Sequence, residues 1–253
     1  MLGLLQTPAP GRPKRPAFLM CRPFGQEAVR TAPIYRAVSD RLAREGCTVL
    51  TVDHHGCGDS PGELGQQSIA DWTEDTLAAH AQLGADAPGL PLHWFAMGLG
   101  ANVAAAAALK AMPAPTCLVL WEPVLSGPAY LERLMDVHRT ELAREMGLEW
   151  HQLIARGREV EPTLPGSVLG FDVGARLHAD LEQLADLPLA ALFGAGIKVR
   201  LAVQEEHRAR FASVNDARFA AQSVENATNW MSTEAFGTAI VPQDVPRTLL
   251  ATL

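Results

Sequence analysis

The sequence is short of cysteine, of positive charge and of long apolar runs. It has four cysteines in 253 residues, and none has the CxxC or Cys/His spacing of a metal module or the density of a disulfide scaffold. No apolar run reaches the about 18 residues of a membrane-spanning helix. The short apolar stretch at the N-terminus is followed, not preceded, by its charges, unlike a secretory signal peptide, so we expect a cytoplasmic protein.

The scarcity of basic residues bears on the kind of partner. Lys and Arg number 21 against 28 Asp and Glu, a net charge of −7, and such a balance disfavours nucleic acid as a partner. The one basic cluster, formed by Arg12, Lys14 and Arg15, lies in a Pro-rich segment typical of a solvated tail. The sequence contains no Walker loop, dinucleotide fingerprint or zinc motif, so we expect no organic cofactor and no metal.

Short apolar runs alternate with longer amphipathic segments along most of the chain. Hydrophobic residues are 48% and charged residues 19%, an ordinary globular composition. The alternation predicts an α/β fold, a mostly parallel sheet flanked by helices. The expected strands are residues 17–21, 48–52, 92–96, 117–121 and 198–203, with a sixth candidate at 228–232.

Residues 127–188 interrupt this alternation. A helical stripe that includes Leu131, Leu134 and Leu142 is followed by a stretch rich in Gly and Pro. We expect an inserted cap over one edge of the sheet, with the core formed by residues 1–126 and 189–253. The alternative is one long crossover connection, and long connections without structure of their own are uncommon.

The loop between the third expected strand and its helix has the pattern of a nucleophile elbow. Right-handed crossovers bring all strand-to-helix loops of a parallel sheet to the same edge, where ligands bind. The elbow needs small residues two positions before and two after its centre, and these are Ala96 and Gly100. The centre is Gly98, which has no side chain and cannot be a nucleophile. No serine lies between Ser68 and Ser126 to take its place.

Several loops resemble those of a known superfamily. Residues 53–60 (DHHGCGDS) resemble the Asp-x-x-Gly-x-Gly-x-Ser loop of the α/β-hydrolase superfamily, and residues 23–25 (PFG) resemble its His-Gly oxyanion loop, with Arg22 in the histidine position. More narrowly, residues 23–27, 56–62 and 120–127 resemble the bacterial group called hydrolase 2 of the exosortase A system. The resemblance covers residues 17–150 and implies an α/β-hydrolase fold with a catalytic triad.

The triad can be sought residue by residue. Acyl transfer needs a nucleophile, a base in hydrogen-bond reach and an acid that orients the base. The acid is expected after the strand at 198–203, where Glu205 and Glu206 lie, or at Glu122 after the preceding strand. The histidine is expected near the C-terminus, yet no histidine follows His207. Nucleophile and base are therefore both missing from their expected places.

Other polar residues at the same edge are candidate substitutes. The candidate catalytic residues are His54, His55, Glu205, Glu206 and His207. A histidine loop can supply a base near neutral pH, and its alternative is a structural turn. The second cluster can supply an acid and a displaced histidine, or be a polar strand end. Cys57 is a candidate thiol nucleophile only if its pKa is depressed.

The elbow keeps its backbone amides even without a nucleophile. The amides of Leu99 and Gly100 start a helix, and helix N-termini attract anions and carbonyl oxygens. With an amide near Gly25 or Gln26 they would form an oxyanion hole. The candidate binding residues are Phe24, Gly25, Gln26, Met97, Gly98, Leu99 and Glu122.

Three functions follow from these residues. The favoured one is binding of a small carbonyl- or carboxylate-bearing ligand under the cap, without a covalent step. The second is a hydrolase, lyase or cyclase that acts on an ester, thioester or related acyl substrate, with His54, His55 or a carboxylate as base. The third, implied only by the resemblance, is an accessory partner of an exopolysaccharide or protein-sorting assembly.

Overall fold

A mostly parallel sheet forms the centre of the protein. The computed structural model describes residues 1–224, 228–232, 235 and 242–253. The strand order is β1-β3-β2-β4-β5-β8-β9, with only β1 antiparallel to its neighbour. The strands are β1 (Leu2–Gln6), β2 (Ala17–Cys21), β3 (Val49–Asp53), β4 (Leu92–Met97), β5 (Cys117–Trp121), β8 (Lys198–Val203) and β9 (Phe219–Ser223). The predicted α/β fold class is confirmed.

The two edge strands differ from the sequence prediction. β1 was not predicted, because its leucines face solvent and show no buried alternation. The sixth strand predicted at 228–232 is wrong, since this segment is a turn and the edge strand is β9 at Phe219–Ser223. β9 is only half-buried and contains Ala and Gln, so it lacks the continuous apolar run that identifies a central strand.

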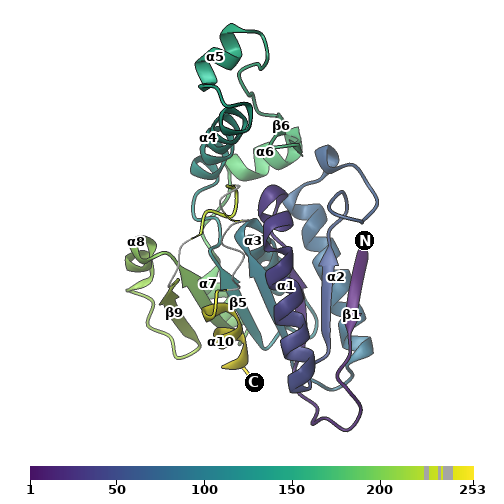
Figure 1. The fold of residues 1–253 in the computed structure, drawn as a ribbon. Helices are drawn as coiled ribbons and strands as arrows, with labels where there is room; N and C mark the ends of the chain where they lie inside the picture. The colour runs from purple at the N-terminus through teal and green to yellow at the C-terminus, as the bar shows by residue number, and fades with distance from the viewer. Residues whose placement is uncertain (225–227, 233–234, 236–241) are drawn as a thin grey trace.

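Helices cover both faces of the sheet (Figure 1). One face packs on α1 (Gly25–Glu45) and α10 (Asp244–Leu250), and the other on α2 (Ile69–Asp86), α3 (Gly98–Ala108) and α7 (Leu189–Gly194). The period of two along β2 explains the division, since Phe18 and Met20 face α1 while Leu19 faces α3. The alanines of α3 let this helix lie close to the strands. Three short helices lie in the loops around the sheet: η1 (Leu64–Gln66), α8 (Glu205–Arg208) and η2 (Ala209–Phe211).

Residues 127–188 lie above the carboxyl ends of the strands (Figure 1). They contain α4 (Gly127–Met146), α5 (Trp150–Ala155), a hairpin of β6 (Gly166–Val168) and β7 (Phe171–Val173), and α6 (Ala175–Glu182). Apolar residues of this segment, such as Leu131 and Leu177, form one buried cluster with Phe24, Trp72 and Leu99 of the core. The hydrophobic effect thus holds this segment on the edge where the strand-to-helix loops meet.

The topology leaves a crevice at that edge. β2 and β4 are neighbours, but the chain leaves β2 through α1 toward β3 and leaves β4 through α3 toward β5. The two loops therefore diverge, and such switch points are where open α/β sheets bind ligands. Both α1 and α3 begin at this crevice. Among the described helices, none is long and apolar enough to cross a lipid bilayer.

Candidate functional site

The turn from β4 to α3 has the sharp backbone of an elbow. Gly98 has a φ of +54°, a left-handed conformation that glycine adopts freely and that strains a residue with a Cβ. A Cβ added at Gly100 would overlap the carbonyl oxygen of Arg22. The first turn of α3 therefore approaches the loop after β2 so closely that only glycine fits there.

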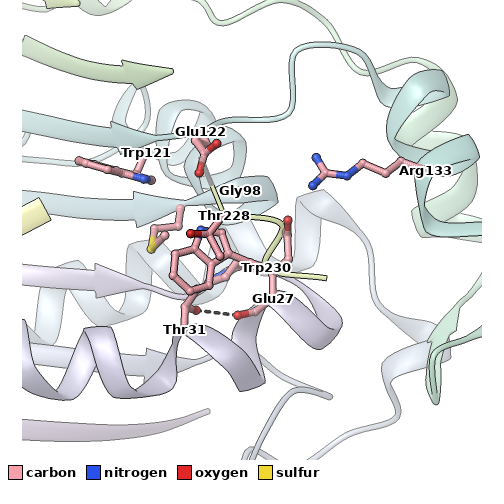
Figure 2. Close-up of a pocket in the computed structure, with 10 residues that line it drawn as sticks. Glu27, Thr31, Gly98, Trp121, Glu122, Arg133, Thr228 and Trp230 are labelled. Carbon is pink, nitrogen blue, oxygen red and sulfur yellow. Dashed lines mark hydrogen bonds between the residues drawn. The ribbon is translucent and has the colours of Figure 1, made fainter. Parts of the chain in front are cut away.

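A carboxyl group from α1 occupies the space beside Gly98 (Figure 2). A Cβ added at Gly98 would lie 2.8 Å from Oε2 of Glu27 and 3.1 Å from Cβ of Pro23. The Tyr130 hydroxyl, from the cap helix α4, donates a hydrogen bond to the same Oε2 at 3.4 Å. Glu27 thus lies where a nucleophilic side chain at position 98 would project.

The surroundings change the protonation of Glu27. Burial is the largest effect and raises the pKa of its carboxyl, Arg133 and the Tyr130 hydroxyl oppose it, the like charge of Glu122 adds to it, and the resulting pKa is about 7. A carboxyl with this pKa exchanges its proton near neutral pH, as a general acid or base requires.

Glu122 supplies a second carboxyl at the end of β5. Its backbone has a φ of +45°, and its amide donates to the Ala202 carbonyl of β8 at 2.7 Å. Gln204 Nε2 donates to Glu122 Oε1 at 2.8 Å. Burial raises the pKa of Glu122 despite this bond and a further one from the Trp230 side chain. Two carboxyl groups with raised pKa therefore share one site.

Two connected cavities meet at Gly98. The inner pocket, of about 40 Å³, is lined by residues that include Glu27, Met97, Gly98, Trp121, Glu122 and Trp230 (Figure 2). The outer pocket, of about 400 Å³, is lined by residues that include Glu27, Gly98, Glu122, Tyr130, Arg133 and His207. Arg133 extends toward the site from α4 of the cap (Figure 2). Glu27, Gly98, Glu122 and Arg133 line both cavities, so the two form one site.

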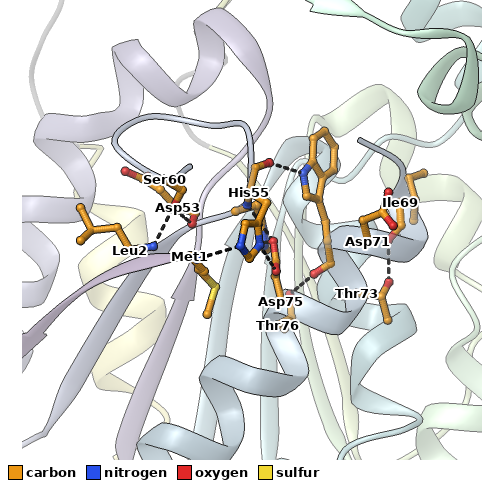
Figure 3. Close-up of polar contacts among 12 residues, drawn as sticks. Met1, Leu2, Asp53, His55, Ser60, Ile69, Asp71, Thr73, Asp75 and Thr76 are labelled. Carbon is orange, nitrogen blue, oxygen red and sulfur yellow. Dashed lines mark hydrogen bonds and ion pairs between the residues drawn. The ribbon is translucent and has the colours of Figure 1, made fainter. Parts of the chain in front are cut away.

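The two histidines after β3 belong to a different set of contacts, shown for His55 in Figure 3. His55 Nδ1 lies 2.6 Å from Asp75 Oδ1, and His55 Nε2 lies 2.9 Å from the Met1 amine. His54 is buried, with Nδ1 3.7 Å from Asp75 Oδ2 and its ring stacked on Trp72. Neither histidine lines the inner or the outer pocket.

The candidates after β8 are divided. His207 is exposed and lines the outer pocket with Gly98 and Glu122. Glu205 accepts a hydrogen bond from the Ser223 hydroxyl of β9, and Glu206 is exposed. Of this cluster, only His207 lines either pocket, and it lines the outer one. Cys57 is a protonated thiol near neutral pH, because burial raises its pKa to about 12.

The candidate binding residues also separate into two groups. Met97, Gly98 and Glu122 line the inner pocket. The remaining candidates are Phe24, Gly25, Gln26 and Leu99, whose side chains and Cα positions face the cap or the core. The Phe24 ring lies 6.4 Å from the ring of Phe171 in β7, for example. The side chains of this second group pack the cap against the elbow and do not line the two pockets.

Sequence analysis missed Glu27 and Arg133. Glu27 lies in the first turn of α1, where an acidic residue is common for reasons of the helix dipole alone. Arg133 lies outside the apolar stripe of α4 and had the pattern of a solvent-facing residue. The signal available for Glu27 was indirect: a glycine at the elbow leaves space that a residue from the loop after β2 can fill.

Within the described part of the chain, no group of three or more His, Cys, Asp or Glu residues is arranged to hold a metal ion. The polar groups around the elbow are the carboxyls of Glu27 and Glu122, the Tyr130 hydroxyl and the Arg133 guanidinium, and such groups can bind and exchange protons with a small polar ligand.

Comparison with solved structures identifies the fold. Est1E from Butyrivibrio proteoclasticus, solved with ferulic acid bound, is 14% identical with a TM-score of 0.61, over 99% of this chain and 94% of that one. A carboxylesterase of Nitrososphaera gargenis is 13% identical with a TM-score of 0.62, and the match covers 99% of this chain and 93% of that one. Proline iminopeptidase of Mycobacterium smegmatis is 18% identical with a TM-score of 0.54, and the match covers 99% of this chain and 96% of that one. At these identities the likeness establishes the fold alone.

Comparison at the level of sequence identifies the family. No curated protein matches the chain. The family described as "Serine aminopeptidase, S33" matches residues 28–168, which is more than half of the sequence. This chain therefore belongs to that serine aminopeptidase family, within the α/β-hydrolase superfamily.

Proposed function

We propose that the site at Gly98 binds a small ligand with a carbonyl or carboxylate group, in a chain that has lost the serine and the histidine of the usual triad. The observation that carries this proposal is the place of Glu27, whose Oε2 is 2.8 Å from the Cβ position of Gly98. A carboxyl group in the nucleophile's space is compatible with a bound acyl ligand and not with a covalent acyl-enzyme.

The helix starts support recognition of a carbonyl or carboxylate oxygen. α1, of 21 residues, and α3, of 11 residues, both begin at the crevice. The first amides of a helix have no intrahelical acceptor and carry a partial positive charge. The outer pocket of about 400 Å³ lies within the size range of small-molecule sites, about 300–1,000 Å³.

The contacts of Arg133 support the proposal that the ligand carries a negatively charged group. Its Nη2 donates to Asn229 Oδ1 at 3.0 Å. Within the described residues no carboxylate forms an ion pair with it, whereas Arg139 on the same helix pairs with Asp136 and Glu161. A guanidinium that lines a pocket and pairs with no carboxylate of the described residues favours a ligand carboxylate, which it can bind through two hydrogen bonds.

The loss of serine chemistry is tested with a fluorophosphonate probe, which labels activated serine hydroxyls covalently. We expect no labelling, because glycine at position 98 offers no hydroxyl and no histidine follows His207 in the sequence. Intact-protein mass spectrometry gives the result, with a serine esterase labelled in parallel. Stoichiometric labelling of this chain at one serine would contradict the proposal.

The role of Arg133 is tested by the affinity for ferulic acid, measured by calorimetry at pH 7. Arg133→Gln should weaken binding about tenfold, the effect of losing a charged hydrogen bond of about 1.4 kcal/mol. Methyl ferulate, which has the same ring without the charge, should lose little affinity. The matched control is Arg139→Gln, which should bind as the parent does. Equal losses in both variants would assign the effect to the cap and not to the ligand carboxylate.

Two other functions are separate proposals. A base role for His54 or His55 has less support, because both contact Asp75 and neither lines the pockets. An accessory role in an exopolysaccharide or protein-sorting assembly rests on the three sequence segments alone, with no structural feature to favour it.

A further inference from the structure

We propose that Glu27 is a general base that activates a water molecule in the inner pocket for direct attack on the acyl carbon of an ester bound in the outer pocket. The chain would then be an esterase without a covalent intermediate. This inference rests on the proposed function for the binding of the acyl ligand and adds a reaction to it.

The sizes of the two cavities assign the two reactants. The inner pocket, of about 40 Å³, exceeds the about 10–15 Å³ that one water needs and is far below the volume of an organic ligand. The outer pocket is ten times larger. Glu27 and Gly98 line both, so a water in the inner pocket and an acyl group in the outer pocket would meet beside the Glu27 carboxyl.

The absence of a side chain at position 98 is part of this arrangement. A Cβ there would approach Glu27 Oε2 to 2.8 Å, and a longer side chain would displace the Glu27 carboxyl from its place beside the inner pocket. Glycine also keeps the positive φ of the elbow without strain. The first amides of α3 therefore keep their place for the carbonyl oxygen, while the Glu27 carboxyl, which lines the inner pocket, takes the place of a side chain at position 98.

The groups that face Glu27 suit a base that works near neutral pH. Glu122, from the loop after β5, faces it with a like charge. Tyr130 and Arg133, from α4, face it with a hydroxyl and a positive charge. His207, from α8, acts on Glu122. The like charge of Glu122 favours the protonated form of the Glu27 carboxyl, and Tyr130 and Arg133 favour its carboxylate form.

The reaction balances with water as the only co-reactant. The Glu27 carboxylate takes a proton from water as the water oxygen bonds to the acyl carbon, and the carbonyl electron pair moves to its oxygen near the first amides of α3. The tetrahedral species then expels the alcohol as its C–O bond breaks, and protonated Glu27 returns the proton to the leaving oxygen. The products are an alcohol and a carboxylic acid, which releases its proton to solvent.

The test compares turnover with binding in the same variants. The esters are 4-nitrophenyl butyrate and methyl ferulate, and the binding probe is ferulic acid. Glu27→Gln should lower kcat/KM by about 10²–10⁴-fold and leave the affinity for ferulic acid within about twofold. Glu132→Gln, an exposed residue of α4 that lines neither pocket, is the matched control and should keep full turnover.

The pH profile separates a base from a merely structural carboxyl. In the parent, kcat/KM should rise with pH through an inflection near 7, because the base must be deprotonated. Glu122→Gln removes the like charge and should move this inflection to lower pH. A structural carboxyl would change the rate in Glu27→Gln without any such movement in Glu122→Gln.

The outcomes distinguish this inference from the proposed function. Ferulic acid binding without turnover of either ester would overturn the esterase and leave the binding function intact. Turnover that survives Glu27→Gln, or that disappears in His54→Ala or His55→Ala with Glu27 in place, would overturn the role of Glu27. If the parent protein neither binds ferulic acid nor hydrolyses either ester, the two proposals are overturned together.

Discussion

Gly127→Ala is expected to lower the free energy of unfolding by about 3 kcal/mol, at the upper end of the usual effect of overpacking. A Cβ added at Gly127 would overlap the carbonyl oxygen of Leu181, which is backbone of α6 and cannot rotate away. α4 would have to shift relative to α6. Because α4 positions Tyr130 and Arg133 at the pockets, binding of ferulic acid should weaken in the same variant. Urea unfolding and calorimetry measure the two effects.

The control for this substitution is Gly194→Ala. Gly194 ends α7, and a Cβ there would meet no atom within 4 Å. Alanine should be neutral or stabilise by up to about 1 kcal/mol through the smaller entropy of the unfolded chain. An unchanged midpoint for Gly127→Ala would mean that the base of the cap adjusts without loss, contrary to the close approach of the two helices.

Asp75→Ala is expected to destabilise the protein by about 3 kcal/mol, the upper end of the cost of leaving buried donors without their acceptor. Asp75 is 7% exposed, and its carboxylate accepts from the His55 amide at 2.7 Å and contacts the His55 ring (Figure 3). It also lies 3.7 Å from Nδ1 of His54. Alanine would leave these groups without their acceptor. Thermal and urea unfolding at pH 7 measure the loss.

The same carboxylate gives a pH dependence with a defined sign. Burial alone would raise the pKa of Asp75, but the contacts with His54 and with the amide and ring of His55 outweigh it and hold the pKa at about 2, below the usual 3.8. A lowered pKa stabilises the folded state above pH 3.8, and this contribution disappears as the pH falls toward 2. This contribution to the free energy of unfolding is about 2 kcal/mol, because each unit of difference in pKa corresponds to about 1.4 kcal/mol.

The control for Asp75 is Glu74→Ala on the same helix. The Glu74 side chain is 70% exposed and pairs with Lys110 at 3.7 Å, so its removal should change stability by less than about 1 kcal/mol. In Asp75→Asn, the decline in stability between pH 4 and pH 2 should be shallower than in the parent. Parallel pH profiles for the two proteins would contradict the assignment of this contribution to Asp75.

Local patterns in the sequence were sufficient for most of the core. The strands at 17–21, 117–121 and 198–203 coincide with β2, β5 and β8, because a central parallel strand is a continuous apolar run. The Ser68 side chain accepts from the Asp71 amide at the start of α2, and a serine followed three positions later by an acidic residue is a local capping signal. The edge strands β1 and β9 were beyond this reasoning, since pairing at an edge leaves side chains half in solvent.

The residues around the elbow show the limit of sequence patterns. Gly98 was found because an elbow is a local motif, with small residues at fixed spacing along one strand and one helix. Glu27 was not, because it is 71 positions away and reaches Gly98 only after β2 and β4 pair and α1 packs on the sheet. His54 and His55 had the right residue type in the right loop, yet their contacts with Asp75 depend on the packing of α2.

The sequence alone determined that this chain folds as a parallel α/β sheet with a glycine at the centre of its elbow and no histidine after position 207. Those properties follow from residue order and from periodicities of two and 3.6, which are local. Tertiary structure decided which side chain lies beside that glycine and which cation of the cap faces it. Such meetings depend on chain segments far apart in sequence, and only long-range packing brings them within a few ångströms.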